Sequence, residues 1–122
     1  MTIRAWKQLI NKSMREAGTY NPDIYGASVE TLAAILARRD YAQAEWERDG
    51  RKLLVEHTNK AGASYMEKHP LLKQIDTAND TALIYWRELG LTPKGFKALT
   101  AAAITQANGA SLSELISDIS NA

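Results

Sequence analysis

Apolar residues recur at helical spacing along much of the chain, and the first segment with this pattern spans residues 3–17. At about 100° per residue, its apolar side chains fall on one side of a helix. Four basic residues fall on the opposite side: Arg4, Lys7, Lys12 and Arg15. The pattern predicts an amphipathic N-terminal helix with one basic face.

Residues 18–26 follow as a predicted linker, because an Asn-Pro-Asp sequence lies there between two glycines. Ser28 is then a candidate N-cap for a long helix that Gly50 ends. Its apolar stripe is interrupted by Arg39. An arginine in such a stripe predicts a buried or intersubunit ion pair, or stacking on an aromatic ring such as that of Trp46.

Residues 51–69 have no helical period. Two short apolar runs flank the turn-forming sequence Asn-Lys-Ala-Gly at residues 59–62, which predicts a small β-hairpin or an extended loop. Pro70 can then occupy the first position of the next helix, where a missing N–H costs nothing.

A third helix is predicted over residues 71–89, where apolar residues repeat at spacings of four and three. This repeat suits packing against another helix. Gly90 can take the left-handed conformation that ends a helix, and Thr92 can cap a new helix. The sequence Leu-Gly-Leu-Thr-Pro therefore predicts a stop and an immediate restart that fix the angle between two packed helices.

The restarted helix is predicted over residues 93–105, and a last amphipathic segment over residues 111–119. The stop and restart have the spacing of a DNA-reading helix-turn-helix. The second helix of such a motif must present polar side chains to base edges. Here it offers Lys94 and Lys97 among alanines, so we expect it to pack instead.

The composition describes one soluble domain, with 122 residues of which 45% are apolar and 24% charged. No apolar run is long enough to span a bilayer, and no signal peptide is evident. Cysteine is absent, which excludes disulfides, thiolate metal sites and a cysteine nucleophile. These features predict an intracellular protein.

The net charge is only +1, but its distribution is uneven. Residues 1–97 hold all 15 basic residues and 12 of the 14 acids, a balance of 15 − 12 = +3. The first acid along the chain is Glu16, so the N-terminal helix is the basic end.

Motifs for chemistry are lacking: the sequence contains no Walker A, GxGxxG or GxSxG pattern. His57 and His69, with Glu56 and Glu67, form the one histidine–carboxylate grouping, and their spacing fits no known metal motif. A structural or capping role is expected for each histidine. We predict no catalytic residue, no metal and no cofactor.

The run "HPLLKQIDTANDTALIYWRELGLTPKGFKAL" resembles the small subunit of phage DNA-packaging terminases, in the branch called P-twenty-seven. The shared features are His69-Pro70 at the start of a helix and Leu-Gly-Leu-Thr-Pro at its end. The preceding long helix and the Lys/Gly-containing loop follow the same order, so the resemblance covers roughly residues 28–100. The basic residue usual after Thr-Pro is matched loosely, by Lys94 and Lys97.

The patterns above predict a mainly α-helical chain with one short β-hairpin, and the resemblance implies a non-enzymatic protein that assembles into a ring. It would bind double-stranded viral DNA in the host cytoplasm and recruit the large subunit, which holds the ATPase and nuclease. Residues 1–106 would form the helical oligomerisation and DNA-binding domain, and residues 107–122 a tail or short helix for partner docking. No membrane partner is implied.

Candidate site residues follow from combining the patterns with the resemblance. The DNA-binding candidates are Arg4, Lys7, Lys12, Arg15, Arg38 and Lys60. The candidates for the interface between copies are Leu71, Ile75, Ala78, Ala82, Ile84, Tyr85, Leu89 and Phe96. The candidates for docking the large subunit are Leu112, Leu115, Ile116 and Ile119.

Two other functions stay open at this point. A small dimeric DNA-binding regulator would bind a specific sequence without a large-subunit partner. An interaction adaptor would have no DNA affinity, and its basic N-terminal face would be an ordinary solvated helix face.

Overall fold

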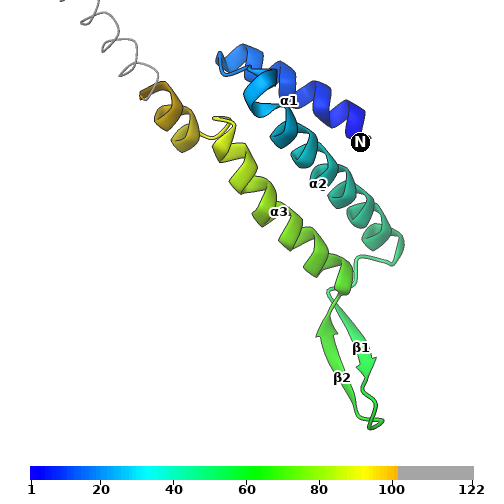
Figure 1. Ribbon diagram of the computed structural model, residues 1–122. Coiled ribbons are helices and arrows are strands. Elements are labelled where there is room, and N and C mark those ends of the chain that lie inside the picture. The colour runs from blue at the N-terminus through cyan, green and yellow to red at the C-terminus, as the bar shows by residue number, and fades with distance from the viewer. Residues whose placement is uncertain (102–122) are drawn as a thin grey trace, which may run out of the picture.

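The structure is a computed structural model that describes residues 1–101, and this part of the chain is mainly helical with one two-stranded antiparallel hairpin (Figure 1). The fold class predicted from the sequence is thereby confirmed. The elements, in order, are α1 (Ile3–Ala17), α2 (Pro22–Arg48), β1 (Leu54–Thr58), β2 (Ser64–Lys68) and α3 (Pro70–Glu88).

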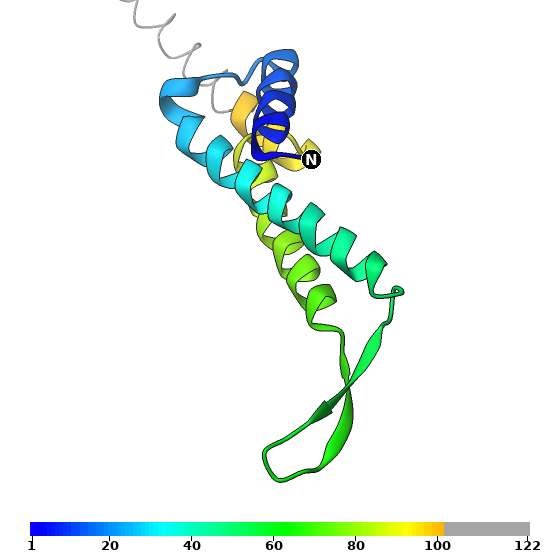
Figure 2. The ribbon, with the colours of Figure 1, turned by 90° about the vertical axis from the view of Figure 1, so that its right-hand side faces the viewer.

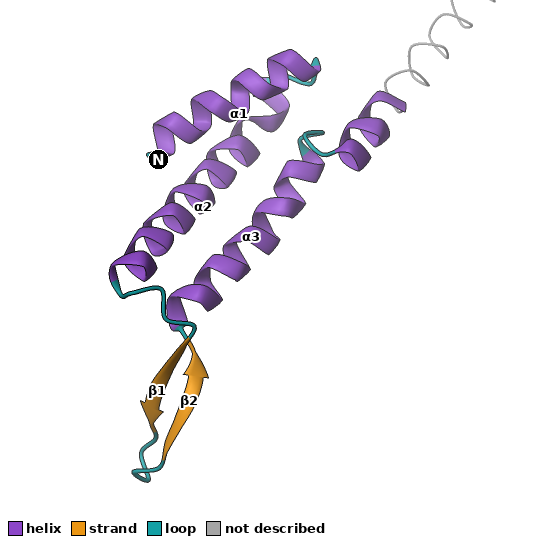
Figure 3. Ribbon diagram, turned by 180° about the vertical axis from the view of Figure 1, so that it is seen from behind, coloured by secondary structure: helices purple, strands orange, loops and turns teal. Residues whose placement is uncertain are grey.

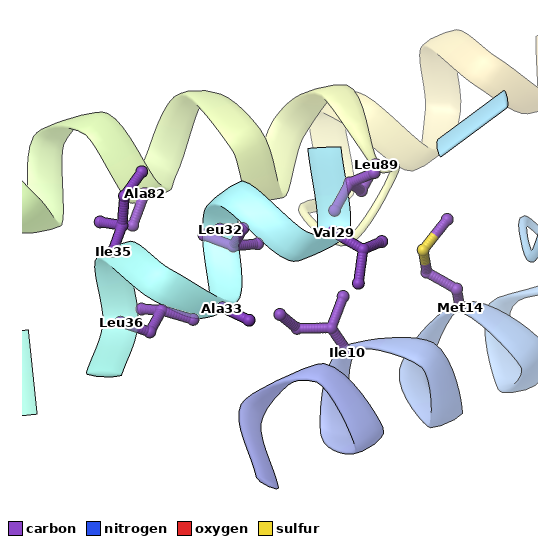
Figure 4. Close-up of a cluster of buried hydrophobic side chains, with 9 residues drawn as sticks. All are labelled: Ile10, Met14, Val29, Leu32, Ala33, Ile35, Leu36, Ala82 and Leu89. Carbon is purple, nitrogen blue, oxygen red and sulfur yellow. The ribbon is translucent and has the colours of Figure 1, made fainter. Parts of the chain in front are cut away.

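The three helices, which we call the helical body, run antiparallel to their neighbours in the chain, and α2 contacts both α1 and α3 (Figures 1 and 3). Their apolar faces meet in one cluster (Figure 4). Ile10 of α1, Leu32 and Leu36 of α2, and Leu89 just after α3 are fully buried. Burying one such side chain contributes roughly 1.5–3 kcal/mol, so this cluster is the main source of stability.

Helix α2 begins earlier than the sequence pattern predicted. Asn21 is its N-cap, with the side-chain oxygen accepting a hydrogen bond from the Ile24 N–H at 3.4 Å, and Pro22 is the first helical residue. The expected linker over residues 18–26 is therefore wrong beyond residue 21, and Ser28 lies inside the helix. An asparagine followed by proline is as good a helix start as it is a turn.

Gly90 ends α3 in the predicted left-handed conformation, with φ = 72°. The Leu91 N–H donates to the Trp86 carbonyl at 2.9 Å, and the Gly90 N–H donates to the Arg87 carbonyl at 3.1 Å. This pair of bonds is a Schellman motif, and α1 ends in the same way at Gly18.

The predicted restart follows at once, with residues 93–101 helical. The Thr92 hydroxyl accepts a hydrogen bond from the Gly95 N–H at 3.0 Å, as expected of an N-cap. A Cβ atom at Gly95 would lie 2.1 Å from the carbonyl oxygen of Arg87, so the two helices meet backbone to backbone. The remainder of this predicted helix and the segment 111–119 lie outside the described residues.

The hairpin, which we call the hairpin arm, projects from the end of the helical body where α2 ends and α3 begins (Figure 2). Its strands pair from Leu54 with Lys68 to Thr58 with Ser64. The Asn59 side chain accepts hydrogen bonds from two N–H groups within the turn, at 3.0 Å each. Nearly every residue of both strands is exposed.

Candidate nucleic-acid and assembly surfaces

The basic face of α1 points to solvent. Arg4, Lys7, Lys12 and Arg15 are all exposed, whereas Ile10 on the same helix is buried. From the first to the last of these residues the helix rises about 16 Å, at about 1.5 Å per residue. Among residues 1–101, no carboxylate forms an ion pair with any of the four, whereas Arg15 stacks on the Tyr20 ring at 4.3 Å. These cations are therefore available to an anionic partner.

A polar network fixes α1 on the helical body. The Asp40 carboxylate accepts hydrogen bonds from the Trp6 indole N–H at 2.7 Å, from Arg39 at 3.2 Å and from the Met1 amino group at 3.0 Å. Arg39 also donates to Asn79 of α3 at 3.2 Å, so the network joins all three helices. Partial burial raises the pKa of Asp40, but these hydrogen bonds outweigh it and hold that pKa below its ordinary value.

Arg39 forms an ion pair and stacks on an aromatic ring, as expected, but the ring is not that of Trp46. Its guanidinium pairs with Asp40 and lies over the ring of Trp6, 5.4 Å from the ring centre, rather than over Trp46. Trp46 instead donates its indole N–H to the carbonyl of Lys52 at 2.8 Å. Arg39, the arginine in the apolar stripe, thus stabilises the packing of helices within one chain.

Arg38 and Lys60, the other predicted DNA contacts, are exposed but stand apart from the basic face of α1. Lys60 lies in the turn of the hairpin arm, at the far end of the molecule from the contact of α1 with α2 (Figure 1). Arg38 lines a groove between α2 and α3. The structure therefore keeps only the α1 residues together as one basic face.

The groove has a volume of about 550 Å³ and combines apolar and polar side chains. Ile35 and Ala42 of α2 and Ala78 of α3 contribute apolar surface, while Thr77 contributes a hydroxyl. A smaller depression beside it includes Tyr41, whose exposed fraction is 70%. No pattern in the sequence singled out Tyr41. A tyrosine three residues after an arginine, off the apolar stripe of a helix, was the available signal.

Most of the predicted interface residues pack within the chain instead of facing outward. Ile75, Ala82 and Leu89 belong to its own buried residues, and Ala78 and Tyr85 pack against the core cluster.

Leu71 is half-buried at the start of α3. By contrast, Ile84 and Phe96 are exposed, at 54% and 41%. The repeat of apolar residues along α3 correctly indicated helix–helix packing, and the structure shows that α2 of the same chain is a partner.

His69 has the structural role predicted for it. It is the N-cap of α3, with Nδ1 accepting from the Leu71 N–H at 3.1 Å, and it is 6% exposed. Because Nδ1 accepts, the ring proton sits on Nε2, which donates to the Asp49 carboxylate at 2.7 Å. This hydrogen bond, with the nearby charge of Lys52, lowers the pKa of Asp49. This hydrogen bond between His69 and Asp49, which we call the clasp, ties the end of α2 to the start of α3.

His57 lies on the exposed hairpin arm, 4.0 Å from Glu67. Lys73 also forms an ion pair with Glu67, and lowers its pKa. Within residues 1–101 no three potential metal ligands converge. The same stretch has no helix with the length and apolarity needed to cross a membrane. The partner-docking candidates Leu112, Leu115, Ile116 and Ile119 lie outside the described residues.

The fold and its surfaces define a small helical protein with a basic outer helix and a projecting arm. Residues 4–105 match the family model of the phage terminase small subunit. The chain belongs to that family. No curated protein and no solved structure matches it.

Family membership assigns the chain a role in phage DNA packaging. The small subunit of a terminase is generally the non-catalytic one, and it works with DNA and a large terminase subunit. Phage terminases act in the cytoplasm of the infected host.

Proposed function

We propose that this chain binds double-stranded viral DNA through the basic face of α1 at the start of packaging. The observation that carries the proposal is the set of exposed cations Arg4, Lys7, Lys12 and Arg15, which have no carboxylate partner among the described residues. Lysine and arginine neutralise phosphates without reading base sequence. Gln8 and Asn11 lie within the same arc and add hydrogen-bonding groups suited to phosphate or sugar oxygens.

We assign the chain no catalytic step of its own. In this proposal it positions the DNA and recruits the large subunit, which supplies the ATPase and nuclease. Residues 107–122 would dock on the large subunit through Leu112, Leu115, Ile116 and Ile119, by the mode in which an amphipathic helix enters a groove. Deleting residues 111–122 should then spare DNA binding and abolish co-purification with the large subunit. Unchanged co-purification would contradict this assignment.

Assembly into a ring is also part of the proposal. A ring repeats the basic face once per subunit, so weak phosphate contacts act together and the apparent affinity rises. Of the eight interface candidates, Ile84 and Phe96 are the strongly exposed ones, and they remain available to another copy. The buried members of that set stabilise the single chain.

A salt-dependent titration of fluorescently labelled duplex DNA tests the DNA-binding proposal. The variant K7A/K12A removes two charges from the basic face, and K94A/K97A removes two exposed charges elsewhere. We expect K7A/K12A to weaken binding and to reduce the slope of log K against log salt by up to about two, since each phosphate contact contributes about 0.9. The control K94A/K97A should behave as the wild type.

The other two functions predict different results in the same titration. An adaptor without DNA affinity would give no salt-dependent signal in the wild type. A dimeric regulator would bind one sequence far more tightly than random duplex DNA. Equal losses in K7A/K12A and K94A/K97A would show that the basic face is not the DNA contact.

A further inference from the structure

Within the described part of the chain, the hairpin arm is joined to the helical body only near its base, where Glu67 and Lys68 form ion pairs with α3. Its exposed apolar side chains include Leu54 at 54%, Met66 at 60% and Tyr65 at 48%. An isolated two-stranded hairpin is at best marginally stable in water, and both of its edges are open to pairing. A ten-residue sheet that exposes this much apolar surface is typical of a segment that is covered in an assembly.

One face of the arm has a particular chemical pattern. The strand register and the alternation of side chains place Leu54, Glu56 and Met66 on the same face. On this face Lys68 pairs with Asp76. The hydroxyls of Thr58 and Ser64 bond to each other at 3.1 Å. Within residues 1–101, Glu56 has no ion-pair partner, so the face presents one free carboxylate between two apolar side chains.

The groove between α2 and α3 offers the complementary pattern. Its apolar lining, from Ile35, Ala42 and Ala78, lies beside the exposed Arg38, for which the described residues provide no carboxylate partner. Tyr41 adjoins it, and tyrosine and arginine are enriched at the centres of protein–protein interfaces. An apolar lining next to a free guanidinium matches the apolar face of the arm with its free carboxylate.

The sizes of the two surfaces also agree. A five-residue strand is about 17 Å long. The groove follows α3 from Lys73 to Thr81, about 12 Å at 1.5 Å per residue, and the depression beside it extends the surface toward Leu71.

The arm extends beyond the end of the helical body, away from α2 and α3 (Figures 1 and 2), so the chain's own arm does not cover the groove between these helices. We propose that the hairpin arm of one copy lies in the α2–α3 groove of the next, with Glu56 facing Arg38. Such a contact joins two different surfaces of the chain. When it repeats from copy to copy around a rotation axis and the last copy meets the first, the copies form a ring. This inference rests on the proposed function for the assembly it serves, and it reassigns Arg38 from DNA to the subunit interface.

Charge-reversal variants, measured by native mass spectrometry, test the proposed pairing of Glu56 with Arg38. E56R and R38E are both substitutions at exposed positions, and each single variant should raise the concentration needed for half assembly at least tenfold. The double variant E56R/R38E should restore assembly toward that of the wild type. R87E, an exposed charge reversal on α3 away from the groove, is the control and should assemble normally. Single variants that assemble like the wild type would overturn the proposal.

A mixing experiment tests the direction of the contact. One variant replaces residues 54–68 with Gly-Gly, which is a feasible connection because the His69 N–H donates to the Leu53 carbonyl at 2.9 Å. The other blocks the groove with T77W at an exposed position. Each alone should be monomeric, and the mixture should give a dimer and nothing larger, since only one intact junction is possible. No dimer, or assembly by the armless variant alone, would contradict the proposal.

The DNA titration distinguishes a failure of the arm contact from a failure of the proposed DNA binding. Monomeric E56R retains the basic face of α1 and should still bind duplex DNA at low salt, with lower apparent affinity. A wild-type protein that assembles through Glu56 and Arg38 without binding DNA would refute the proposed function and leave the arm contact standing. A wild-type protein that binds DNA as a monomer would refute the arm contact alone.

Discussion

The helical body and the hairpin arm use apolar residues in opposite ways. In the body, Ile10, Leu32 and Leu36 are fully covered by neighbouring helices of the same chain. In the arm, Leu54 and Met66 stand in solvent although they have the same chemical character. The body accounts for the stability of one chain, whereas the exposed apolar side chains of the arm are explained by the contact that we propose with another copy.

Deleting one large side chain from each region should show the contrast most strongly. L36A leaves a cavity in the core and should lower the free energy of unfolding by about 2–5 kcal/mol. L54A should change it by less than about 0.5 kcal/mol when the chain is monomeric. Urea unfolding of both variants in the R38E background checks this, because that background separates folding from assembly. Equal losses would show that the arm is part of the core.

The junction after α3 should tolerate no side chain at Gly95. A methyl group there would meet the Arg87 carbonyl at 2.1 Å, so G95A should destabilise the chain by about 1–3 kcal/mol through overpacking. Gly26 is the matched control, since it lies inside α2 and a Cβ atom there meets nothing within 4 Å. G26A should stabilise the chain by about 0.5–1 kcal/mol. Thermal melts of the two variants should therefore move in opposite directions.

The clasp between the end of α2 and the start of α3 should have a smaller effect. H69A removes the N-cap of α3 and the hydrogen bond to Asp49, and should cost about 1 kcal/mol. H57A, on the exposed arm, should cost much less. Urea unfolding measures both, and a loss at His57 equal to that at His69 would contradict the structural difference between the two histidines.

The smallest effect concerns pH. The hydrogen bond from His69 holds the pKa of Asp49 below the ordinary 3.8 in the folded chain. Its contribution to stability is therefore fully present above about pH 3.8 and is lost as the pH falls through the lower folded pKa. D49N should lower stability near pH 6, and this loss should shrink as the pH falls below 3.8, as urea unfolding across that range will show. In the H69A background this pH dependence should be smaller, because only the nearby charge of Lys52 then lowers the pKa of Asp49.

Local chemistry made much of the fold predictable from sequence. Gly90 and Thr92 define a helix end and a helix start through their own backbone and side-chain preferences, and the Asn-Lys-Ala-Gly turn at residues 59–62 defines the hairpin. The start of α2 was misjudged because Asn21 and Pro22 suit a turn and a helix N-terminus equally well.

The surfaces were less predictable, because periodicity shows that a helix packs but not against which neighbour. The apolar repeat of α3 was assigned to contacts between copies, and the structure places Ile75, Ala82 and Leu89 in the core of one chain. The ring that stacks on Arg39 depends on how α1 crosses α2, which no local pattern encodes. The exposure of the arm likewise depends on where the hairpin leaves the helical body.

Cysteine cross-linking tests the arm-in-groove contact most directly, because the natural chain contains no cysteine. The double variant Glu56→Cys/Arg38→Cys, treated with a bismaleimide cross-linker at a concentration where the wild type assembles, should give a ladder of covalent oligomers on a denaturing gel. Each single variant should give at most a trace of dimer. A double variant that assembles but yields no ladder would place Glu56 and Arg38 in different parts of the assembly, and would contradict the account.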